Sequence, residues 1–267
     1  MTLPQEEMLA VLRNLCQQDT RIEAAMLYGS FVYGEADEFS DLDVILYFAD
    51  EALKDVDQRA WVAQIRPVEL FYVNGFGSRV AIFDNLVRGE FHFDRVSNMH
   101  KLGDLHDEVW FPSPEKVIVL DRHGSLLPYL RRLNDKLERD TTEKRQYICD
   151  DFLNWFLFGM NVLARGEHAR ALEILQLVHD NVLHMARLDE QQTEHWITPT
   201  RALERELSID AYARYAQCTA GLNKSALWNT YRAAWQWGKA WIQAQHPGTL
   251  LDKLETRFSD YYRQAMS

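Results

Sequence analysis

The chain has 267 residues, of which 47% are hydrophobic and 26% are charged. This composition is typical of a globular protein with a large core, and it excludes disordered, collagen-like and mini-protein classes. Because 29 Lys and Arg residues stand against 40 Asp and Glu residues, the net charge is -11, and the surface repels phosphate backbones and anionic membranes. We therefore expect no nucleic-acid partner and no membrane partner.

Cysteine usage and apolar segments indicate the compartment. The three cysteines lie far apart and form no CxxC pair, so we expect neither a zinc knuckle nor a disulfide framework. The N-terminal segment has no basic region followed by an apolar run, so we expect no secretion signal. The longest strongly apolar stretch, 155–163, is far shorter than the roughly 20 residues of a membrane-spanning helix. Together these features predict a cytoplasmic protein.

The first 120 or so residues mix helix and strand patterns. Apolar residues at three- and four-residue spacing predict a helix from Pro4 to about Cys16. Segments rich in β-branched and aromatic residues, or alternating in polarity, predict strands at 22–27, 42–48, 68–73, 80–83, 86–93 and 117–120. In the strand at 86–93, the polar residues Arg88, Glu90 and His92 share one face, because successive strand side chains point to opposite faces.

From Leu126 onward the pattern is almost entirely helical. Apolar stripes at helical spacing run through 148–163, 171–185 and 227–242, and the first stripe is interrupted at Arg165-Gly166. Long amphipathic helices with short connections form bundles. We therefore predict an α+β protein with an N-terminal mixed-sheet domain, residues 1–122, and a C-terminal all-helical bundle, residues 123–267.

The segment 26–48, MLYGSFVYGEADEFSDLDVILYF, contains the polar residues that indicate chemistry. A predicted strand ends at Gly29-Ser30, where the glycine lets backbone N–H groups approach a ligand and the serine hydroxyl adds a donor. Such a turn suits a phosphate oxygen, so Gly29 and Ser30 are candidate nucleotide-binding residues.

Asp41 and Asp43 open the next strand. Two residues apart on a strand, their carboxylates leave the same face with Cα atoms roughly 6.5 to 7 Å apart. Carboxylates held this close repel each other, and a divalent cation compensates for that repulsion. Mg²⁺ fits best, because it prefers carboxylate oxygens together with substrate phosphates and could neutralise an incoming triphosphate despite the acidic surface.

These residues resemble the nucleotidyltransferase superfamily that includes DNA polymerase β and the antibiotic nucleotidyltransferases, whose signature is GS followed by DxD or DxE. The segments MLYGSFVYGEADEFSD, VAIFDNLVRGEFHF and GMNVLARGEHARALEIL are similar to the lincosamide nucleotidyltransferases, so the resemblance covers both halves of the chain. It implies a polymerase β-like N-terminal domain. The second acid in those relatives is often Glu, whereas this chain has Asp43.

The resemblance maps the family's third acid onto Glu90, on a strand beside the one that bears the two aspartates. Asp41, Asp43 and Glu90 are therefore the predicted catalytic and metal-binding residues. A Glu90 carboxyl with a raised pKa would take the proton from the substrate hydroxyl. The sequence leaves open whether Glu90 is this base or only a third metal ligand.

Three further sets of polar residues have alternative roles. Arg88 either contacts phosphate or pairs with Glu90, and His92 either contacts substrate or is a hydrogen-bonded framework residue. Arg165, Glu167 and Arg170, at the break between two predicted helices, either reach the nucleotide or drug across a domain cleft or form a solvated helix start. Of these we assign Arg170 as a candidate nucleotide-binding residue.

The resemblance implies transfer of a nucleoside monophosphate, AMP from MgATP, to a hydroxyl of a lincosamide such as lincomycin or clindamycin, with release of pyrophosphate and antibiotic resistance. ATP or another nucleoside triphosphate and the antibiotic are then the partners, and a homodimer is the implied assembly. An aminoglycoside is the alternative substrate, because a polycation suits an acidic cleft. A different class of function is a non-catalytic nucleotide-binding or antitoxin-like module on the same fold.

Overall fold

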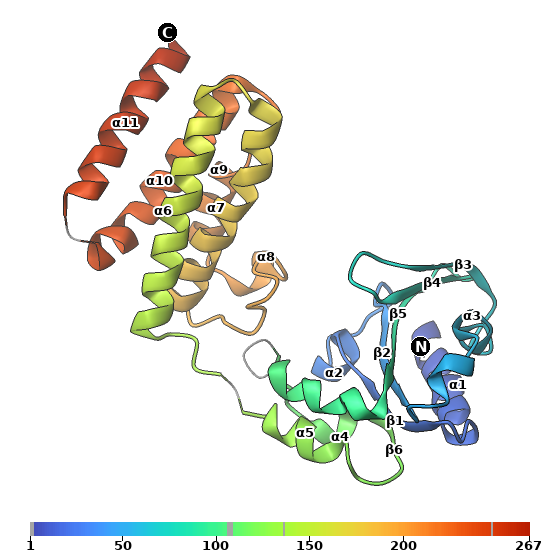
Figure 1. Cartoon of the computed structure of the whole chain (residues 1–267). Coiled ribbons are helices and arrows are strands. Elements are labelled where there is room, and N and C mark those ends of the chain that lie inside the picture. Colours follow the sequence, from blue (N-terminus) through green and yellow to red (C-terminus); the bar gives the residue numbers. More distant parts are fainter. Residues whose placement is uncertain (1–2, 106–108, 136, 247) are drawn as a thin grey trace. The chain divides into compact units, whose positions relative to one another are not determined.

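A mixed β-sheet organises the first of two compact units, Met1–Leu137 and Glu138–Ser267 (Figure 1). The computed structural model describes residues 3–105, 109–135, 137–246 and 248–267. Within those residues the sheet has six strands in the order β3-β4-β5-β2-β1-β6. Each strand lies where the sequence predicts one: β1 (Ile22–Leu27), β2 (Leu42–Phe48), β3 (Val68–Val73), β4 (Arg79–Phe83), β5 (Arg88–Arg95) and β6 (Ile118–Asp121).

The central pair β2 and β5 runs parallel, whereas the other neighbouring strands run antiparallel. The register of this pair places Asp43 opposite Glu90 and Leu42 opposite Gly89. Because residues directly opposite each other point to the same face, Asp43 and Glu90 project together. The prediction that Glu90 lies on a strand beside the aspartates is thereby confirmed.

The two faces of the central strands differ in polarity. On β5, Gly89, Phe91 and Phe93 are buried, whereas the alternate side chains Arg88, Glu90 and His92 are only partly buried. Phe93 packs edge-on against Trp61, with ring centroids 5.8 Å apart. Burial of each large apolar side chain contributes about 1.5–3 kcal/mol. The apolar face therefore stabilises the unit and leaves the opposite face for polar groups.

The helices of this unit cover the two sides of the sheet unequally. Figure 1 shows α1 (Pro4–Gln18) and α3 (Gln58–Val62) on one side and α2 (Ser30–Tyr33) on the other. The connections also contain η1 (Leu53–Asp55), η2 (Val96–Leu105), α4 (Pro114–Val117) and α5 (Leu127–Arg132). Because α5 contacts both η2 and α4, the first compact unit extends past residue 122, the boundary expected from the sequence.

The second unit is helical, as predicted. Its helices are α6 (Thr142–Ala164), α7 (His168–Asp189), α8 (Leu203–Glu206), α9 (Ile209–Gln217), α10 (Lys224–Gln245) and α11 (Thr249–Met266). The Thr141 hydroxyl caps α6 by accepting from the Lys144 N–H at 3.1 Å. This helix ends at the predicted break, where Gly166 has a φ of 82°. No helix in the described ranges is both long and apolar enough to cross a bilayer.

Close backbone approach brings the long helices together. A Cβ on Gly159 of α6 would lie 2.1 Å from the Tyr231 hydroxyl oxygen of α10, so only glycine fits there. The same hydroxyl donates to the Ala171 carbonyl of α7 at 2.9 Å. Tyr231 therefore links three helices, and this buried hydroxyl has the partner that it needs.

Candidate active site

A glycine turn connects β1 to the candidate site. After β1 ends at Leu27, the Tyr28 N–H donates to the Asp43 carbonyl at 3.1 Å, which extends the pairing with β2. Gly29 then has φ 71° and ψ -155°, a backbone conformation essentially restricted to glycine. The chain turns at this residue, and the short helix α2 begins at Ser30.

The loop before Asp41 is held by α1. The side-chain amide of Gln5, which is 1% exposed, donates to the Glu38 carbonyl at 3.1 Å and to the Ser40 carbonyl at 2.9 Å. The Asp37 N–H also donates to the Ser40 hydroxyl at 2.9 Å. These bonds fix the approach of the chain to β2, and no pattern in the sequence indicated this role for Gln5.

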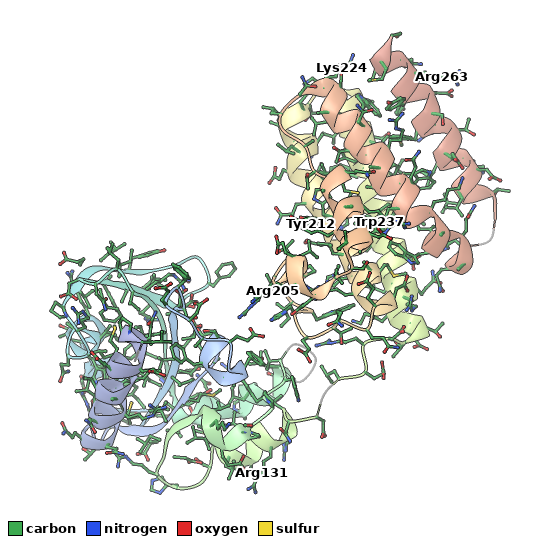
Figure 2. All side chains as sticks on the ribbon, turned by 180° about the vertical axis from the view of Figure 1, so that it is seen from behind. Arg131, Arg205, Tyr212, Lys224, Trp237 and Arg263 are labelled. Atoms are coloured by element: carbon green, nitrogen blue, oxygen red, sulfur yellow. The ribbon has the colours of Figure 1, made fainter. Side chains whose placement is uncertain are left out.

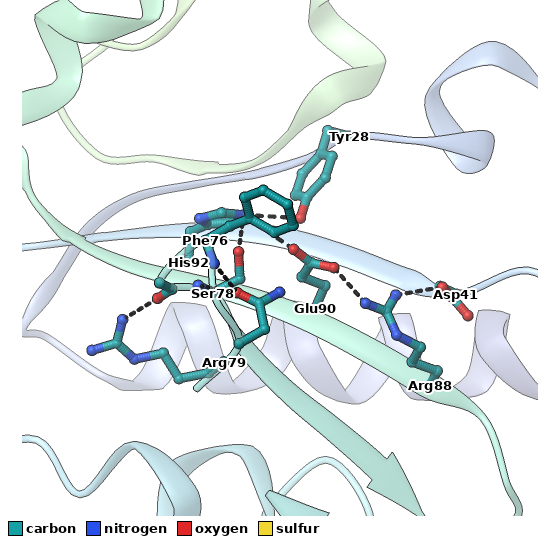
Figure 3. A network of polar contacts seen from close by, with 10 residues as sticks. Tyr28, Asp41, Phe76, Ser78, Arg79, Arg88, Glu90 and His92 are labelled. Atoms are coloured by element: carbon teal, nitrogen blue, oxygen red, sulfur yellow. Dashed lines mark hydrogen bonds and ion pairs between the residues drawn. The ribbon is translucent and has the colours of Figure 1, made fainter. Parts of the chain in front are cut away.

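One guanidinium connects two of the three predicted carboxylates (Figure 3). Arg88 Nη1 donates to Asp41 Oδ2 at 2.6 Å, and Arg88 Nη2 donates to Glu90 Oε2 at 2.5 Å. The contact with Glu90 is one of the two roles that the sequence left open for Arg88. The contact with Asp41 links residues 47 positions apart and was not expected.

A second group of polar residues lies around His92. Its Nε2 atom lies 3.0 Å from the Tyr28 hydroxyl, 3.3 Å from the Ser78 hydroxyl and 3.9 Å from Glu90 Oε1. Burial lowers the pKa of His92, so its imidazole is neutral at neutral pH. The hydrogen bonds fit the framework role for this histidine. Tyr28 and Ser78 were missed by sequence reasoning, although Tyr28 directly precedes the glycine turn.

Glu90 has a pKa below its ordinary value. Burial raises this pKa, but the Ser78 hydroxyl and the Arg88 guanidinium favour the charged carboxylate and lower it more. The expectation of a raised pKa was therefore wrong. The physical reason for the lowered pKa is the pair of neighbours beside Glu90. The Arg88 cation and the Ser78 donor stabilise the ionised carboxylate more than partial burial destabilises it. Glu90 is ionised at neutral pH.

Burial and neighbouring carboxylates both raise the pKa of Tyr28. The pKa of its phenol is raised well above the ordinary value by burial and by the charges of Asp43 and Glu90. The hydroxyl is therefore protonated at neutral pH and can donate a hydrogen bond toward His92.

The three predicted carboxylates have the ligand chemistry that a divalent cation requires. Asp41, Asp43 and Glu90 supply the hard oxygen ligands that such ions prefer, and Gly29 leaves room for the Asp43 carboxylate. In the described part of the chain, however, no group of three or more His, Cys, Asp or Glu side chains is arranged to hold a metal ion. Asp41 and Glu90 instead accept hydrogen bonds from Arg88.

Arg170 lies in the second unit, at the start of α7. Its Nη1 atom lies 3.3 Å from Glu167 Oε2, and its guanidinium carbon lies 5.3 Å from the centre of the Phe158 ring. Its side chain is 50% exposed, so the pair with Glu167 adds little stability. The nucleotide-binding role of Arg170 stays a prediction, as do the phosphate-binding roles of Gly29 and Ser30.

Two family models match the two units. Residues 11–73 match the family described as polymerase beta, nucleotidyltransferase. Residues 141–249 match the family described as lincosamide nucleotidyltransferase-like, C-terminal domain. The chain is a nucleotidyltransferase. The matched part of this nucleotidyltransferase includes Gly29, Ser30, Asp41 and Asp43, and it ends before Glu90. The predicted fold class and family are confirmed.

Two solved structures align with most of the chain at low sequence identity. An aminoglycoside 6-adenyltransferase from Bacillus subtilis aligns with 98% of the present chain and 99% of its own chain, at 16% identity and a TM-score of 0.42. A nucleotidyltransferase-like protein from Exiguobacterium sibiricum aligns with 89% of this chain and 77% of its own, at 17% identity and a TM-score of 0.41. A search of curated protein sequences finds no significant match.

Proposed function

We propose that this nucleotidyltransferase transfers AMP from MgATP to a hydroxyl of a lincosamide antibiotic, with release of pyrophosphate and resistance as the result. The observation that supports the reaction most is the register of β2 and β5, which sets Asp43 beside Glu90 on the face that also bears Asp41 and Arg88. The lincosamide is proposed because the family matched by residues 141–249 is described by that substrate. The homodimer implied by the resemblance remains a prediction.

In the proposed reaction, Glu90 is the proton acceptor. The acceptor hydroxyl oxygen forms a bond to the α-phosphorus, the bond from that phosphorus to the bridging oxygen of pyrophosphate breaks, and the hydroxyl proton passes to the Glu90 carboxylate. A carboxylate with a lowered pKa is a weak base. It suffices if the proton is transferred as the P–O bond forms, because the attacking oxygen becomes more acidic at that stage.

Asp41 and Asp43, with Glu90, would hold the divalent cation. When bound, a divalent cation supplies charge neutralisation at the phosphates and at the leaving pyrophosphate. The polypeptide would orient the nucleotide with the Gly29 turn and the Ser30 hydroxyl, which we propose as contacts for the β- and γ-phosphates. The acidic overall charge makes local neutralisation necessary, because the protein as a whole repels a triphosphate.

Pyrophosphate release tests the proposal directly. Purified protein with ATP and Mg²⁺ is expected to release pyrophosphate when clindamycin or lincomycin is added, and the drug should gain the mass of one AMP unit. Asp43→Asn, prepared in parallel and shown to fold by circular dichroism, should lose this release. Replacement of ATP by the other nucleoside triphosphates identifies the preferred donor.

Two results would contradict the proposal in different ways. Pyrophosphate release with aminoglycosides and not with lincosamides would identify an aminoglycoside as the substrate. Nucleotide binding without release in the presence of any antibiotic would support the non-catalytic module. A susceptible strain that expresses the protein should gain resistance to lincosamides and remain sensitive to aminoglycosides.

A further inference from the structure

Arg88 spans two carboxylates that the proposed function assigns to metal binding. Figure 3 shows its guanidinium between Asp41 and Glu90, in contact with both through separate nitrogen atoms at 2.6 and 2.5 Å. Hydrogen bonds between ionised partners are stronger than those between neutral groups, and the planar fork of arginine suits two acceptors at once. One fixed positive charge therefore links two acids that would otherwise repel each other.

The position of Arg88 follows from the strand register. Arg88 and Glu90 are two residues apart on β5 and therefore share a face. Asp41 directly precedes β2, so the pairing of Leu42 with Gly89 sets it near Arg88, the first residue of β5. The bridge is thus a consequence of the parallel pairing of β2 with β5, because both partners lie where the sheet places them.

A divalent cation and the Arg88 guanidinium compete for the same carboxylates. Asp41 and Glu90 already accept charge-assisted hydrogen bonds from Arg88, and a second cation among these carboxylates would be repelled by the first. The Arg88 side chain is 39% exposed, so it has access to solvent when it leaves. The cation-binding arrangement and the arginine bridge are therefore alternative states of the same residues.

We propose that Arg88 takes the place of a divalent cation between Asp41 and Glu90 in the metal-free protein, and that metal binding requires its guanidinium to leave both carboxylates. This inference rests on the proposed function for the assignment of the metal ligands. Arg88 is then a positioning residue with two effects. It keeps the acids ordered when no metal is bound, and it lowers the affinity of the site for metal.

Mn²⁺ binding to the full-length protein without nucleotide tests the competition. Mn²⁺ prefers the same oxygen ligands as Mg²⁺, and its binding is followed by electron paramagnetic resonance. Arg88→Gln removes the positive charge and should tighten Mn²⁺ binding on the order of tenfold, because a pair of charge-assisted hydrogen bonds no longer opposes the ion. Asp43→Asn in the same background should abolish the tight binding and so identify the site.

Arg79 offers a matched control on the neighbouring strand β4. Its guanidinium donates to Gln58 Oε1 at 2.5 Å and to the Gly77 carbonyl at 2.6 Å. Arg79→Gln thus removes one positive charge near the site and leaves the bridge between Asp41 and Glu90 intact. Its Mn²⁺ affinity should stay close to that of the wild type. An equal gain in Mn²⁺ affinity for Arg79→Gln and Arg88→Gln would mean that the loss of one positive charge near the site raises the affinity, rather than the loss of direct competition for the carboxylates. That result would overturn the proposal.

Thermal unfolding supplies a second readout. Without metal, Arg88→Gln should melt below the wild type, because Asp41 and Glu90 lose their shared partner. Saturating Mn²⁺ should close this gap, since the wild-type bridge is then broken as well, and tighter binding stabilises the variant more. Arg88→Lys should shift the affinity in the same direction by a smaller factor, because one ammonium group does not supply the two-nitrogen fork. It serves as the test variant if Arg88→Gln does not fold.

The outcomes separate this inference from the proposed function. Unchanged or weaker Mn²⁺ binding in Arg88→Gln and Arg88→Lys overturns the role of Arg88, whether or not the protein transfers nucleotides. The role of Arg88 is also overturned if neither the wild type nor any of the arginine variants binds Mn²⁺ in a way that Asp43→Asn abolishes. Tightened binding without pyrophosphate release in any antibiotic assay confirms the competition and contradicts the proposed reaction.

Discussion

Gly29 lies against the carboxylate of Asp43, so closely that a Cβ on Gly29 would be 2.2 Å from Asp43 Oδ2. The glycine of the GS pair and the second acid of the DxD pair are therefore in direct contact. Glycine is favoured at position 29 for two reasons. Its positive φ of 71° disfavours a side chain, and the Asp43 carboxylate leaves no space for one. The turn at Gly29 and the side chain of Asp43 thus form one structural group.

Gly29→Ala should reduce stability and displace Asp43. The backbone strain alone is expected to lower the free energy of unfolding by about 1–3 kcal/mol, and the clash with Asp43 adds to it. Transfer activity and Mn²⁺ affinity should fall together, because the moved carboxylate belongs to the proposed metal site. Chemical denaturation, metal binding and pyrophosphate release measure the three effects.

Gly34→Ala is the control for this prediction. Gly34 also has a positive φ, 73°, but a Cβ there would meet no atom within 4 Å. The substitution should lower the free energy of unfolding by about 1 kcal/mol, with metal affinity unchanged. If both alanine variants lost metal affinity equally, the contact between Gly29 and Asp43 would not be the cause.

Glu90→Gln should lower turnover more than substrate affinity. A positioned general base contributes about 10²–10⁴-fold to rate, so a loss of kcat in this range with little change in KM for ATP is expected. Steady-state kinetics over a range of Mg²⁺ concentrations distinguish the two roles of Glu90. Recovery of kcat at high Mg²⁺ would show that Glu90 acts as a metal ligand alone.

The lowered pKa of Glu90 predicts a dependence of stability on pH. A carboxyl whose pKa is lower in the folded state stabilises the protein above its ordinary pKa, and this contribution is lost as pH falls through the lowered value. Wild-type protein should therefore lose more stability than Glu90→Gln when pH falls below 4.5, the ordinary value. Denaturant titrations of both proteins between neutral and acidic pH measure the difference. Parallel curves at all pH values would contradict the role of Arg88 and Ser78 in lowering this pKa.

Arg187→Met should destabilise the helical unit strongly. Arg187 is fully buried, and it donates to Glu206 Oε2 at 2.7 Å and to the carbonyls of Pro199, Gln192 and Arg201 at 2.8, 2.9 and 2.6 Å. Its loss leaves a carboxylate and three carbonyls with fewer donors, which costs about 3–5 kcal/mol. Limited proteolysis should show earlier cleavage between α7 and α8, the segment that these bonds hold.

Arg263 on α11 (labelled in Figure 2) is the matched control for Arg187. Its side chain is 76% exposed and pairs with Asp260 one helical turn away. Arg263→Met should change the free energy of unfolding by no more than about 0.5 kcal/mol, because exposed pairs add little. Similar losses in the two variants would show that burial does not determine the effect.

Local patterns in the sequence predicted the six strands and the helices α1, α6, α7 and α10. The alternation of polar and apolar residues on β5 identified the face that carries Arg88, Glu90 and His92, and helical stripes identified α6, α7 and α10. These predictions succeed because the periods of the strand and the helix are recorded in neighbouring residues. The GS and DxD pairs were visible for the same reason, since each lies within a few consecutive residues.

Contacts between distant segments were not predictable in this way. The bridge from Arg88 to Asp41 and the hydrogen bonds of His92 with Tyr28 and Ser78 depend on which strands pair and in which register. The direction of the Glu90 pKa shift was mistaken on sequence alone, because that direction is a balance between burial and the charges that the folded sheet brings near.

The sequence by itself thus determined where the strands of the sheet lie along the chain and which face of β5 carries Arg88, Glu90 and His92. Only the tertiary structure decided that one arginine spans two of the acids, since pairing across 47 residues has no local period that could reveal it.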